Sequence, residues 1–215
     1  IEDTEHAPGA DVPVYKQVAR VLLERGYEVR TLAARPDVAD LVQRVQTDPG
    51  ELVFNLCESL GGVDAHAIRV AALLELLGKP FTGAGSLGMT LAQDKALAKK
   101  IFSFHDIRYP KFSIMQAGQV EWSDELQFPL FVKPSNTDSS VGIDERALVH
   151  NVKELMERIG FVQGEIKAPV LIEEFIDGRE IFVGVIGDES LEALPILEWD
   201  FSKVKRGPKF ATAEA

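Results

Sequence analysis

The segment Phe128–Ile143 reads FPLFVKPSNTDSSVGI, an apolar run that ends in lysine and proline and continues into small polar residues. Lys133 stands at the end of a predicted strand. Pro134 removes an amide donor and disfavours a helix, so the chain is expected to leave the sheet as a loop. Hydroxyl groups of Ser139 and Ser140 and nearby backbone amides can share one concavity, which suits phosphate oxygens. The pattern therefore predicts a phosphate-binding loop, with a surface lysine before an ordinary turn as the alternative.

The composition is that of an ordinary globular protein. Of its 215 residues, 46% are apolar and 27% are charged, and the formal net charge is −11. Nucleic-acid binding depends on clustered Lys and Arg, so we expect none, and an anionic ligand must be held locally. No apolar stretch reaches the roughly 18 to 20 residues of a membrane helix, and the N-terminus is unlike a signal peptide, so we expect no membrane partner. The single cysteine, Cys57, fits a reducing compartment, and we expect a cytoplasmic location.

Residues 11 to about 85 alternate between helical and strand-like patterns. Apolar residues at helical spacing predict helices over 11–26, 36–46 and 65–78. The runs YEVRTLA and ELVFNL between them are typical of strands. This alternation predicts a Rossmann-like parallel-sheet domain over residues 1–90. No strand is predicted before the first helix, so the natural chain is expected to begin earlier.

The second half of the chain is predicted to mix helices and strands. The expected elements are the helix LAQDKALAKKIF, the strands RYPKFSIM and PLFVKP, and the helix ALVHNVKELMERIG. They assign residues 91–172 to a central subdomain, and PVLIEEFI then opens a third part, 173–215, with a hairpin around GDESLE. The tail has neither a helix stop nor a closing strand, so the natural chain is expected to continue. The fold class is α/β, with an α+β second half.

Carboxylates on or beside apolar strands mark the segment LIEEFIDGREI, Leu171–Ile181. An unpaired carboxylate is costly in such a place. If Glu173 and Glu180 flank a turn, they can receive ribose hydroxyls or an adenine amino group, and Glu174 is a further acceptor. The alternative is a half-exposed strand with its charges in solvent.

A glycine-rich motif, GAGSLG at Gly83–Gly88, matches the dinucleotide-binding pattern G-x-G-x-x-G. That fingerprint requires a strand directly before it, and the preceding residues GKPFT give poor support. No clear strand ending in Asp or Glu follows about 20 residues later. We favour a glycine-rich turn, with an NAD-dependent oxidoreductase as the less favoured alternative.

Taken in order, six segments resemble the ATP-grasp superfamily and, within it, the D-alanine–D-alanine ligase branch. They are VFNLCESLGG, LLELLGKPFTGAG, LAQDK, FPLFVKPSNTDSSVGI, LIEEFIDGREI and LPILEW. The resemblance runs from about Val53 to Asp200 and rests on the order and spacing of these segments. It implies a Rossmann-like N-terminal domain followed by an ATP-grasp fold that is incomplete at its C-terminus, with the nucleotide between two antiparallel sheets.

The resemblance implies a role for each matching residue. The ATP phosphates would be contacted or covered by Lys95, Lys133, Ser139, Ser140 and Gly142. Of these, Lys133 and Ser140 would be catalytic. The adenosine part would be contacted by Glu173, by the backbone of Glu174, Phe175 and Ile176, and by Glu180 at the ribose.

The implied reaction joins a small amino-acid-like carboxylate to an amine, in the setting of peptidoglycan synthesis. The carboxylate attacks the γ-phosphorus of ATP to give an acyl phosphate, and the amine displaces phosphate to leave an amide or peptide bond. Lysines and Mg²⁺ would act by electrostatic stabilisation, without a protein nucleophile. The family's metal ligands would lie beyond Ala215, so no residue here is assigned to metal. A non-catalytic adenine-nucleotide-binding module is therefore the main alternative.

The substrates stay open at this point. The ligases carry a glycine-rich segment with a Glu near the N-terminus, and IEDTEHAPGADVPVY does not contain one. Asp64 or His66 falls where those enzymes often have an acidic residue. One interpretation of His66 is contact with a substrate carboxylate, and the alternative is a capping or surface role. The apolar N-terminal helices leave room for a homodimer.

Overall fold

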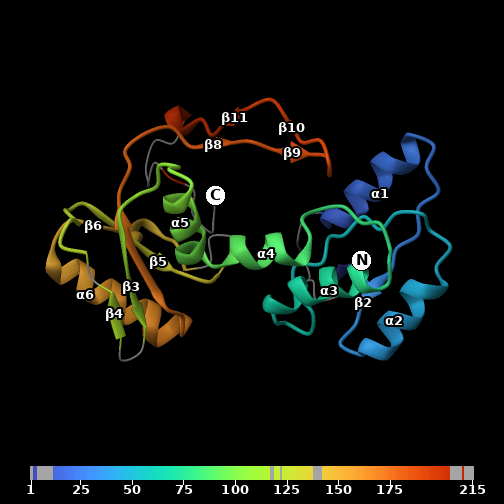
Figure 1. The fold of residues 1–215 in the computed structure, drawn as a ribbon, viewed down its shortest axis with the longest axis horizontal. Helices are drawn as coiled ribbons and strands as arrows, with labels where there is room; N and C mark the ends of the chain where they lie inside the picture. The colour runs from blue at the N-terminus through green and yellow to red at the C-terminus, as the bar shows by residue number, and fades with distance from the viewer. Residues whose placement is uncertain are drawn as a thin grey trace. The chain divides into compact units, whose positions relative to one another are not determined.

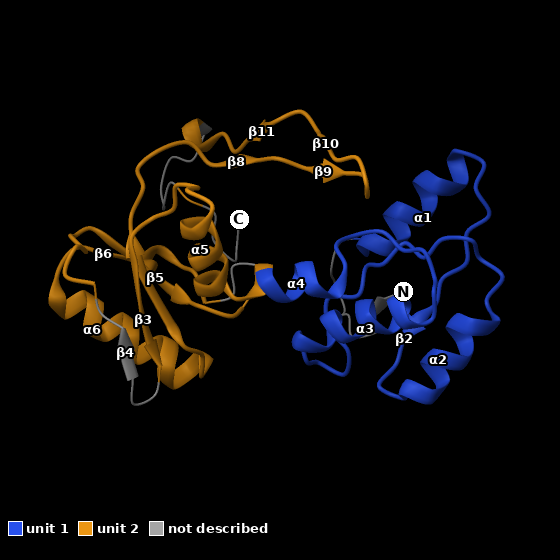
Figure 2. Ribbon diagram, in the orientation of Figure 1, with its two compact units in different colours: residues 1–91 blue, residues 92–215 orange. Residues whose placement is uncertain are grey.

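A computed structural model describes residues 2–3, 12–116, 119–121, 123–137, 142–203 and 210 (Figure 1). The chain forms two compact units, residues 1–91 and 92–215 (Figure 2). Both contain helices and strands, so the fold is mixed α/β, as predicted. Among the described residues, no helix combines the length and apolar character needed to cross a membrane.

The first unit packs helices around short parallel strand pairings. Strand β1 (Glu2–Asp3) pairs in parallel with β2 (Ala33–Ala34), and an isolated parallel bridge joins Val53 to Phe81. Its helices are α1 (Val14–Glu24), α2 (Val38–Thr47) and α3 (Ala65–Leu76), and α4 (Ser86–Gln93) begins in it. A core of apolar side chains holds α2 and α3 together through Leu41, Val45, Val70 and Leu74.

Two predictions for this unit are corrected. A strand does precede the first helix, because Glu2–Asp3 pairs with Ala33–Ala34. In addition, within the part of the chain that the structure describes, the predicted strands over 27–33 and 51–56 pair through one residue each, Ala33 and Val53.

The ladder at Val53 is short because side chains bind the next amides. Val53 exchanges backbone hydrogen bonds with Pro80 and Thr82, at 2.8 and 3.0 Å. The Asn55 N–H then donates to the Thr82 hydroxyl, and the Cys57 N–H donates to the Asn55 side-chain oxygen. Side-chain acceptors of this kind compete with a sheet ladder for backbone donors.

The second unit is organised around an antiparallel sheet with the order β4-β3-β7-β5-β6. Its strands are β3 (Phe112–Gln116), β4 (Gln119–Glu121), β5 (Leu130–Pro134), β6 (Leu148–Val149) and β7 (Val170–Glu174). Helices α5 (Lys95–Phe104) and α6 (Val152–Phe161) lie on opposite sides of the sheet (Figure 1). The short helices η1 (Glu145–Ala147) and η2 (Val162–Ile166) flank β6 and α6.

Strand alternation sorts the side chains of this sheet between its two faces. Towards α6 lies the larger apolar core, which includes Leu130, Val132, Val170, Ile172, Leu155 and Ile159. Towards α5, Ile114 and Leu171 pack against Ala96. The register pairs Phe131 with Glu173 and Lys133 with Leu171, so Lys133 and Glu173 also lie on the α5 face.

Side-chain caps set helix boundaries that the apolar pattern did not predict. The segment LAQDKALAKKIF contains the end of α4 and then α5, because the Asp94 carboxylate accepts from the Ala96 and Leu97 amides. Helix α6 begins after Asn151, whose side chain accepts from the Glu154 N–H at 3.1 Å. The residues before it pair as β6, so the helix predicted over 147–160 is shorter at its start.

After β7 the chain forms an antiparallel ribbon. Strand β8 (Ile181–Phe182) pairs with β11 (Leu197–Glu198), and β9 (Val185–Ile186) pairs with β10 (Glu192–Ala193), as the predicted hairpin requires. The side chains of all four strands are exposed. A short helix, η3 (Phe201–Lys203), follows.

Candidate functional site

A buried carboxylate shared by two lysines lies on the α5 face of the sheet. Glu173 of β7 is 5% exposed. Its Oε1 lies 2.5 Å from Lys133 Nζ, and its Oε2 lies 3.0 Å from Lys99 Nζ. A buried charge requires partners of this kind, because desolvation otherwise disfavours it. Three elements, β5, β7 and α5, therefore contribute one charged cluster.

Lys99 was not among the residues predicted for the site. It is four residues after Lys95 on α5, and residues at that spacing share one helix face. The DKALAKK pattern therefore contained a signal for a second site lysine. The pattern could not indicate that Glu173 is the partner of Lys99, because the two side chains meet through the packing of α5 on the sheet.

Lys95 lies where strand β5 ends. Its backbone N–H donates to the Ser135 carbonyl at 3.2 Å, and its Nζ donates to the Thr137 carbonyl. Ser135 and Thr137 follow directly on the strand that carries Lys133. The structure thus brings the start of α5 and the end of β5 together.

The structure describes the residues before and after the predicted phosphate loop, up to 137 and from 142. Ser139 and Ser140 lie outside the described residues. Gly142 has a φ of +71°, and a Cβ there would lie 3.2 Å from Ile166 Cγ1. Glycine suits this position because it adopts positive φ without steric cost and leaves room for Ile166.

An arginine pair holds the backbone after this loop. Arg158 of α6 is 3% exposed, donates to the Gly142 carbonyl, and lies 3.0 Å from Asp144 Oδ1. Arg146 lies 2.6 Å from Asp144 Oδ2. Burial raises the pKa of Asp144, but the hydrogen bond from Arg146 and the charges of both arginines outweigh it and hold that pKa below its ordinary value.

Aromatic rings connect the lysine cluster to a cavity. The Lys133 Nζ lies 5.5 Å from the centroid of the Phe131 ring. That ring is stacked at 6.3 Å on Phe175 and meets Phe210 edge-on at 5.0 Å. Phe175 and Phe210 both line a cavity of about 980 Å³. The ring of Phe131 therefore lies between Lys133 of the cationic cluster and Phe175 of the aromatic cavity.

Most residues predicted to contact adenosine gather at this cavity. Phe175, Ile176 and Glu180 line it, together with Trp199. The backbone N–H of Trp199 donates to the Glu180 backbone carbonyl at 2.9 Å. Glu174 is held differently, because its Oε2 accepts from the Lys111 N–H at 3.3 Å. Glu173 is engaged with the two lysines. Phe175, Ile176 and Glu180 thus form one group, and Glu173 belongs to the lysine cluster.

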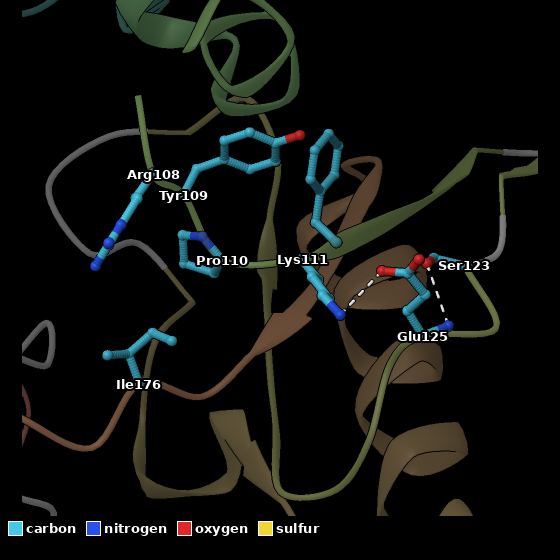
Figure 3. Close-up of a pocket in the computed structure, with 8 residues that line it drawn as sticks. Arg108, Tyr109, Pro110, Lys111, Ser123, Glu125 and Ile176 are labelled. Carbon is cyan, nitrogen blue, oxygen red and sulfur yellow. Dashed lines mark hydrogen bonds and ion pairs between the residues drawn. The ribbon is translucent and has the colours of Figure 1, made fainter. Parts of the chain in front are cut away.

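A second cavity, of about 820 Å³, is also lined by Ile176 (Figure 3). Its wall is formed by residues 108–112, Ser123, Glu125 and Ile176. The ammonium of Lys111 lies 2.9 Å from Glu125 Oε2, and this hydrogen-bonded pair raises the pKa of Lys111. Arg108 also lines this cavity, so its charged side chains carry one net positive charge, as the lysine cluster does, but of the predicted site residues Ile176 alone lines it.

The GAGSLG motif does not present a free helix N-terminus. The Glu75 carboxylate accepts from the Ser86 N–H at 2.8 Å and from the Ser86 hydroxyl at 2.6 Å, at the start of α4. These hydrogen bonds hold the pKa of Glu75 below its ordinary value. In a dinucleotide fingerprint the helix N-terminus receives the pyrophosphate. Here a carboxylate of the chain occupies that position, which disfavours the oxidoreductase alternative.

The remaining polar candidates in the first unit make local contacts. The Cys57 thiol is buried and donates to the Ser59 carbonyl. His66 Nδ1 lies 3.0 Å from the Leu60 carbonyl, while Asp64 precedes α3 without a side-chain cap. Within the part of the chain that the structure describes, no three His, Cys, Asp or Glu side chains gather as a metal site.

Comparison with known proteins identifies the family to which the chain belongs. Residues 95–204, just over half of the chain, match the family model described as D-ala D-ala ligase C-terminus. The chain belongs to this family, the ATP-grasp, D-alanine–D-alanine ligase-like proteins.

Two relatives show how much of the chain is similar to known sequences. The D-alanine–D-alanine ligase of Desulfotalea psychrophila is 34% identical over 187 residues, which cover 84% of this chain and 55% of that protein. An uncharacterised protein of Sinorhizobium fredii is 37% identical over 152 residues, or 71% of this chain and 44% of that protein. The chain spans about half the length of the curated relatives it matches.

Solved structures give the same result. The D-alanine–D-alanine ligase of Bacillus anthracis complexed with ATP is 26% identical, with a TM-score of 0.62 over 87% of this chain and 62% of that one. The VanG D-Ala:D-Ser ligase of Enterococcus faecalis is 27% identical, with a TM-score of 0.55 over 69% of this chain and 43% of that one.

Proposed function

We propose that this chain binds the nucleotide of an ATP-dependent carboxylate–amine ligase of the D-alanine–D-alanine ligase type. The observation that carries the proposal is the lysine cluster of Lys133, Lys99 and Glu173, joined through Phe131 to the aromatic cavity. Phosphates require positive charge, and a purine requires flat apolar walls with a few polar groups. The two requirements are met side by side here.

The proposal assigns each end of the nucleotide to one part of the second unit. Lys133 and Lys95 contact the phosphates, because both lie where β5 ends. The adenine lies in the cavity against Phe175 and the backbone of Ile176, and Glu180 receives the ribose hydroxyls. Roles for Ser139, Ser140 and Gly142 at the γ-phosphate stay predictions from the sequence.

ATP, when bound, supplies the phosphoryl group that converts a substrate carboxylate into an acyl phosphate, which an amine then attacks. The contribution of this chain is to hold the phosphates in a cationic environment, which stabilises the charge that spreads over the phosphoryl oxygens. We propose small amino acids as the substrates, since the relatives are named as ligases of D-alanine with D-alanine or D-serine. Mg²⁺ belongs to the proposal, and we assign no residue to it, since no three His, Cys, Asp or Glu side chains gather as a metal site among the described residues.

We also propose a domain division to accompany this function. Residues 1–90 form a Rossmann-like domain, 91–172 a central ATP-grasp subdomain, and 173–215 the beginning of a second one. The parallel pairings of β1 with β2 and of Val53 with Phe81 support the first assignment. A cytoplasmic location and a homodimer complete the proposal.

A calorimetric titration tests the proposed function. The chain is titrated with Mg-ADP and, in parallel, with NADH, and both titrations are repeated on Lys133→Ala. We expect ADP to bind, NADH not to bind, and the substitution to weaken ADP by about tenfold or more, since it removes a charge-assisted contact. The matched control is Lys153→Ala on α6, an exposed lysine beyond the opposite face of the sheet. NADH binding that survives Lys133→Ala would refute the proposal.

A further inference from the structure

We propose that Lys99 is a positioning residue that keeps Lys133 available to the nucleotide by sharing the Glu173 carboxylate. This inference rests on the proposed function, because it concerns the same phosphate end of the site. It adds a residue for which the ligase resemblance implied no role. Lys99 acts through Glu173, so it need not touch the nucleotide.

The geometry divides one carboxylate between two ammonium groups. Lys133 Nζ lies 2.5 Å from Oε1, and Lys99 Nζ lies 3.0 Å from Oε2. The side chains of Lys99 and Lys133 are only 12% and 19% exposed, so water does little to screen the cluster. Lys99 reaches Glu173 from α5, whereas Lys133 reaches it from the neighbouring strand β5.

The formal charges explain why a second lysine matters. Two ammonium groups and one carboxylate leave the cluster with one net positive charge. Without Lys99, Glu173 alone would balance Lys133, and the cluster would be neutral. A nucleotide phosphate would then have to compete with Glu173 for Lys133, without the net charge that attracts it. Lys99 therefore gives the cluster the net positive charge that attracts a nucleotide phosphate to Lys133.

A merely structural role for Lys99 makes a different prediction. Its side chain also lies on the sheet, with Nζ 5.9 Å from the centroid of the Phe112 ring. If Lys99 served only to support the fold, its loss would weaken all ligands of the site to a similar degree. If it sets the charge of the cluster, its loss weakens ligands with phosphates and leaves adenosine nearly unchanged.

The experiment measures the affinities of ADP and adenosine for the wild type, Lys99→Gln and Lys99→Arg. We expect Lys99→Gln to weaken ADP by about tenfold, the effect of removing one charge near a phosphate, and adenosine by less than about twofold. Lys99→Arg keeps the charge and should restore most of the ADP affinity. The matched control is Lys153→Gln, which removes one exposed charge from α6 and should change neither affinity.

A double variant tests the charge balance directly. Lys99→Gln combined with Glu173→Gln returns the cluster to one net positive charge, carried by Lys133. The ratio of ADP to adenosine affinity should then return towards the wild-type value, even if both affinities fall through other contacts of Glu173.

The outcomes separate this inference from the proposed function. If the wild type binds ADP and Lys99→Gln leaves the ratio of ADP to adenosine affinity unchanged, Lys99 has no positioning role and the proposed function stands. If the wild type binds neither ligand, the proposed function fails and this inference fails with it.

Discussion

Replacing Arg158 by methionine removes a buried guanidinium while keeping an unbranched side chain of similar reach. The wild-type group donates to the Gly142 carbonyl, pairs with Asp144, and lies 4.8 Å from the centroid of the Phe161 ring. These contacts join α6 to the backbone that follows the predicted phosphate loop. Arg158→Met therefore tests how strongly this part of the second unit is held.

The structure sets the size of the expected loss. The charged hydrogen bond to Gly142 contributes about 1.5–3 kcal/mol, and the contact with Phe161 about 0.5–2 kcal/mol. The ion pair contributes about 1 kcal/mol at most, because Asp144 is 38% exposed and keeps Arg146 as a partner. Methionine also avoids the cost of burying a charge, which offsets part of the loss. We expect a net loss of about 2 kcal/mol in the free energy of unfolding.

The loss should depend on pH. The pKa of Asp144 is lowered in the folded chain, so its ion pairs stabilise the fold above the pKa of an unfolded aspartate, about 3.9. That stabilisation disappears as the pH falls through the lower folded-state pKa. The difference between wild type and Arg158→Met should therefore be largest above about pH 5 and should shrink in acid.

Urea denaturation followed by tryptophan fluorescence measures this effect. Both tryptophans, Trp122 and Trp199, fall in the second unit, so the signal reports on that unit. Arg146→Met is the control, because Arg146 shares Asp144 and Phe161 but is 71% exposed, and it should cost well under about 1 kcal/mol. A variant as stable as the wild type, or a loss that is equal at every pH, would refute the reasoning.

Two further substitutions probe the same region. Asn151→Ala removes the N-cap of α6 and should cost about 1 kcal/mol in urea denaturation. Asn151→Ser keeps an uncharged acceptor at the N-cap and should restore most of that loss, whereas equal stability of the alanine variant and the wild type would contradict the capping role. Gly142→Ala places a Cβ at positive φ and 3.2 Å from Ile166, and should lower the free energy of unfolding by about 1–2 kcal/mol or more. Gly164→Ala is the control, because a Cβ there meets nothing within 4 Å. Equal losses for the two variants would contradict the role assigned to Gly142.

The sheet of the second unit could be predicted because its signals are local. PLFVKP and PVLIEEFI are short apolar runs, and both form strands, β5 and β7. Helices α1, α2 and α3 followed from apolar spacing for the same reason. Boundaries were less predictable where a polar side chain decides them. Asp94 and Asn151 each start a helix that the apolar pattern would begin earlier.

The candidate site was predictable only in part, because its key contacts join distant segments. The lysine at the end of β5 and the acceptors of β7 were visible in the sequence, as single residues. Their pairing through Glu173 depends on the antiparallel register of β5 and β7, and Lys99 enters through the packing of α5. Glu75 at the start of α4 is a similar case, since no pattern in GAGSLG indicates that a carboxylate 11 residues earlier occupies the helix N-terminus.

The contrast between β7 and the ribbon that follows it has a consequence for hydrogen exchange. Strand β7 has a hydrogen-bonded neighbour on both sides and is buried along most of its length, whereas β8–β11 are two-residue strands with exposed side chains. Amides of β7 should therefore exchange only when the second unit unfolds, and amides of the ribbon through small local openings. Lys133 and Glu173 are anchored in the slowly exchanging part, while Glu180 adjoins the rapidly exchanging part. A ligand that spans both would slow exchange mainly in the ribbon, where the free energy of opening is small.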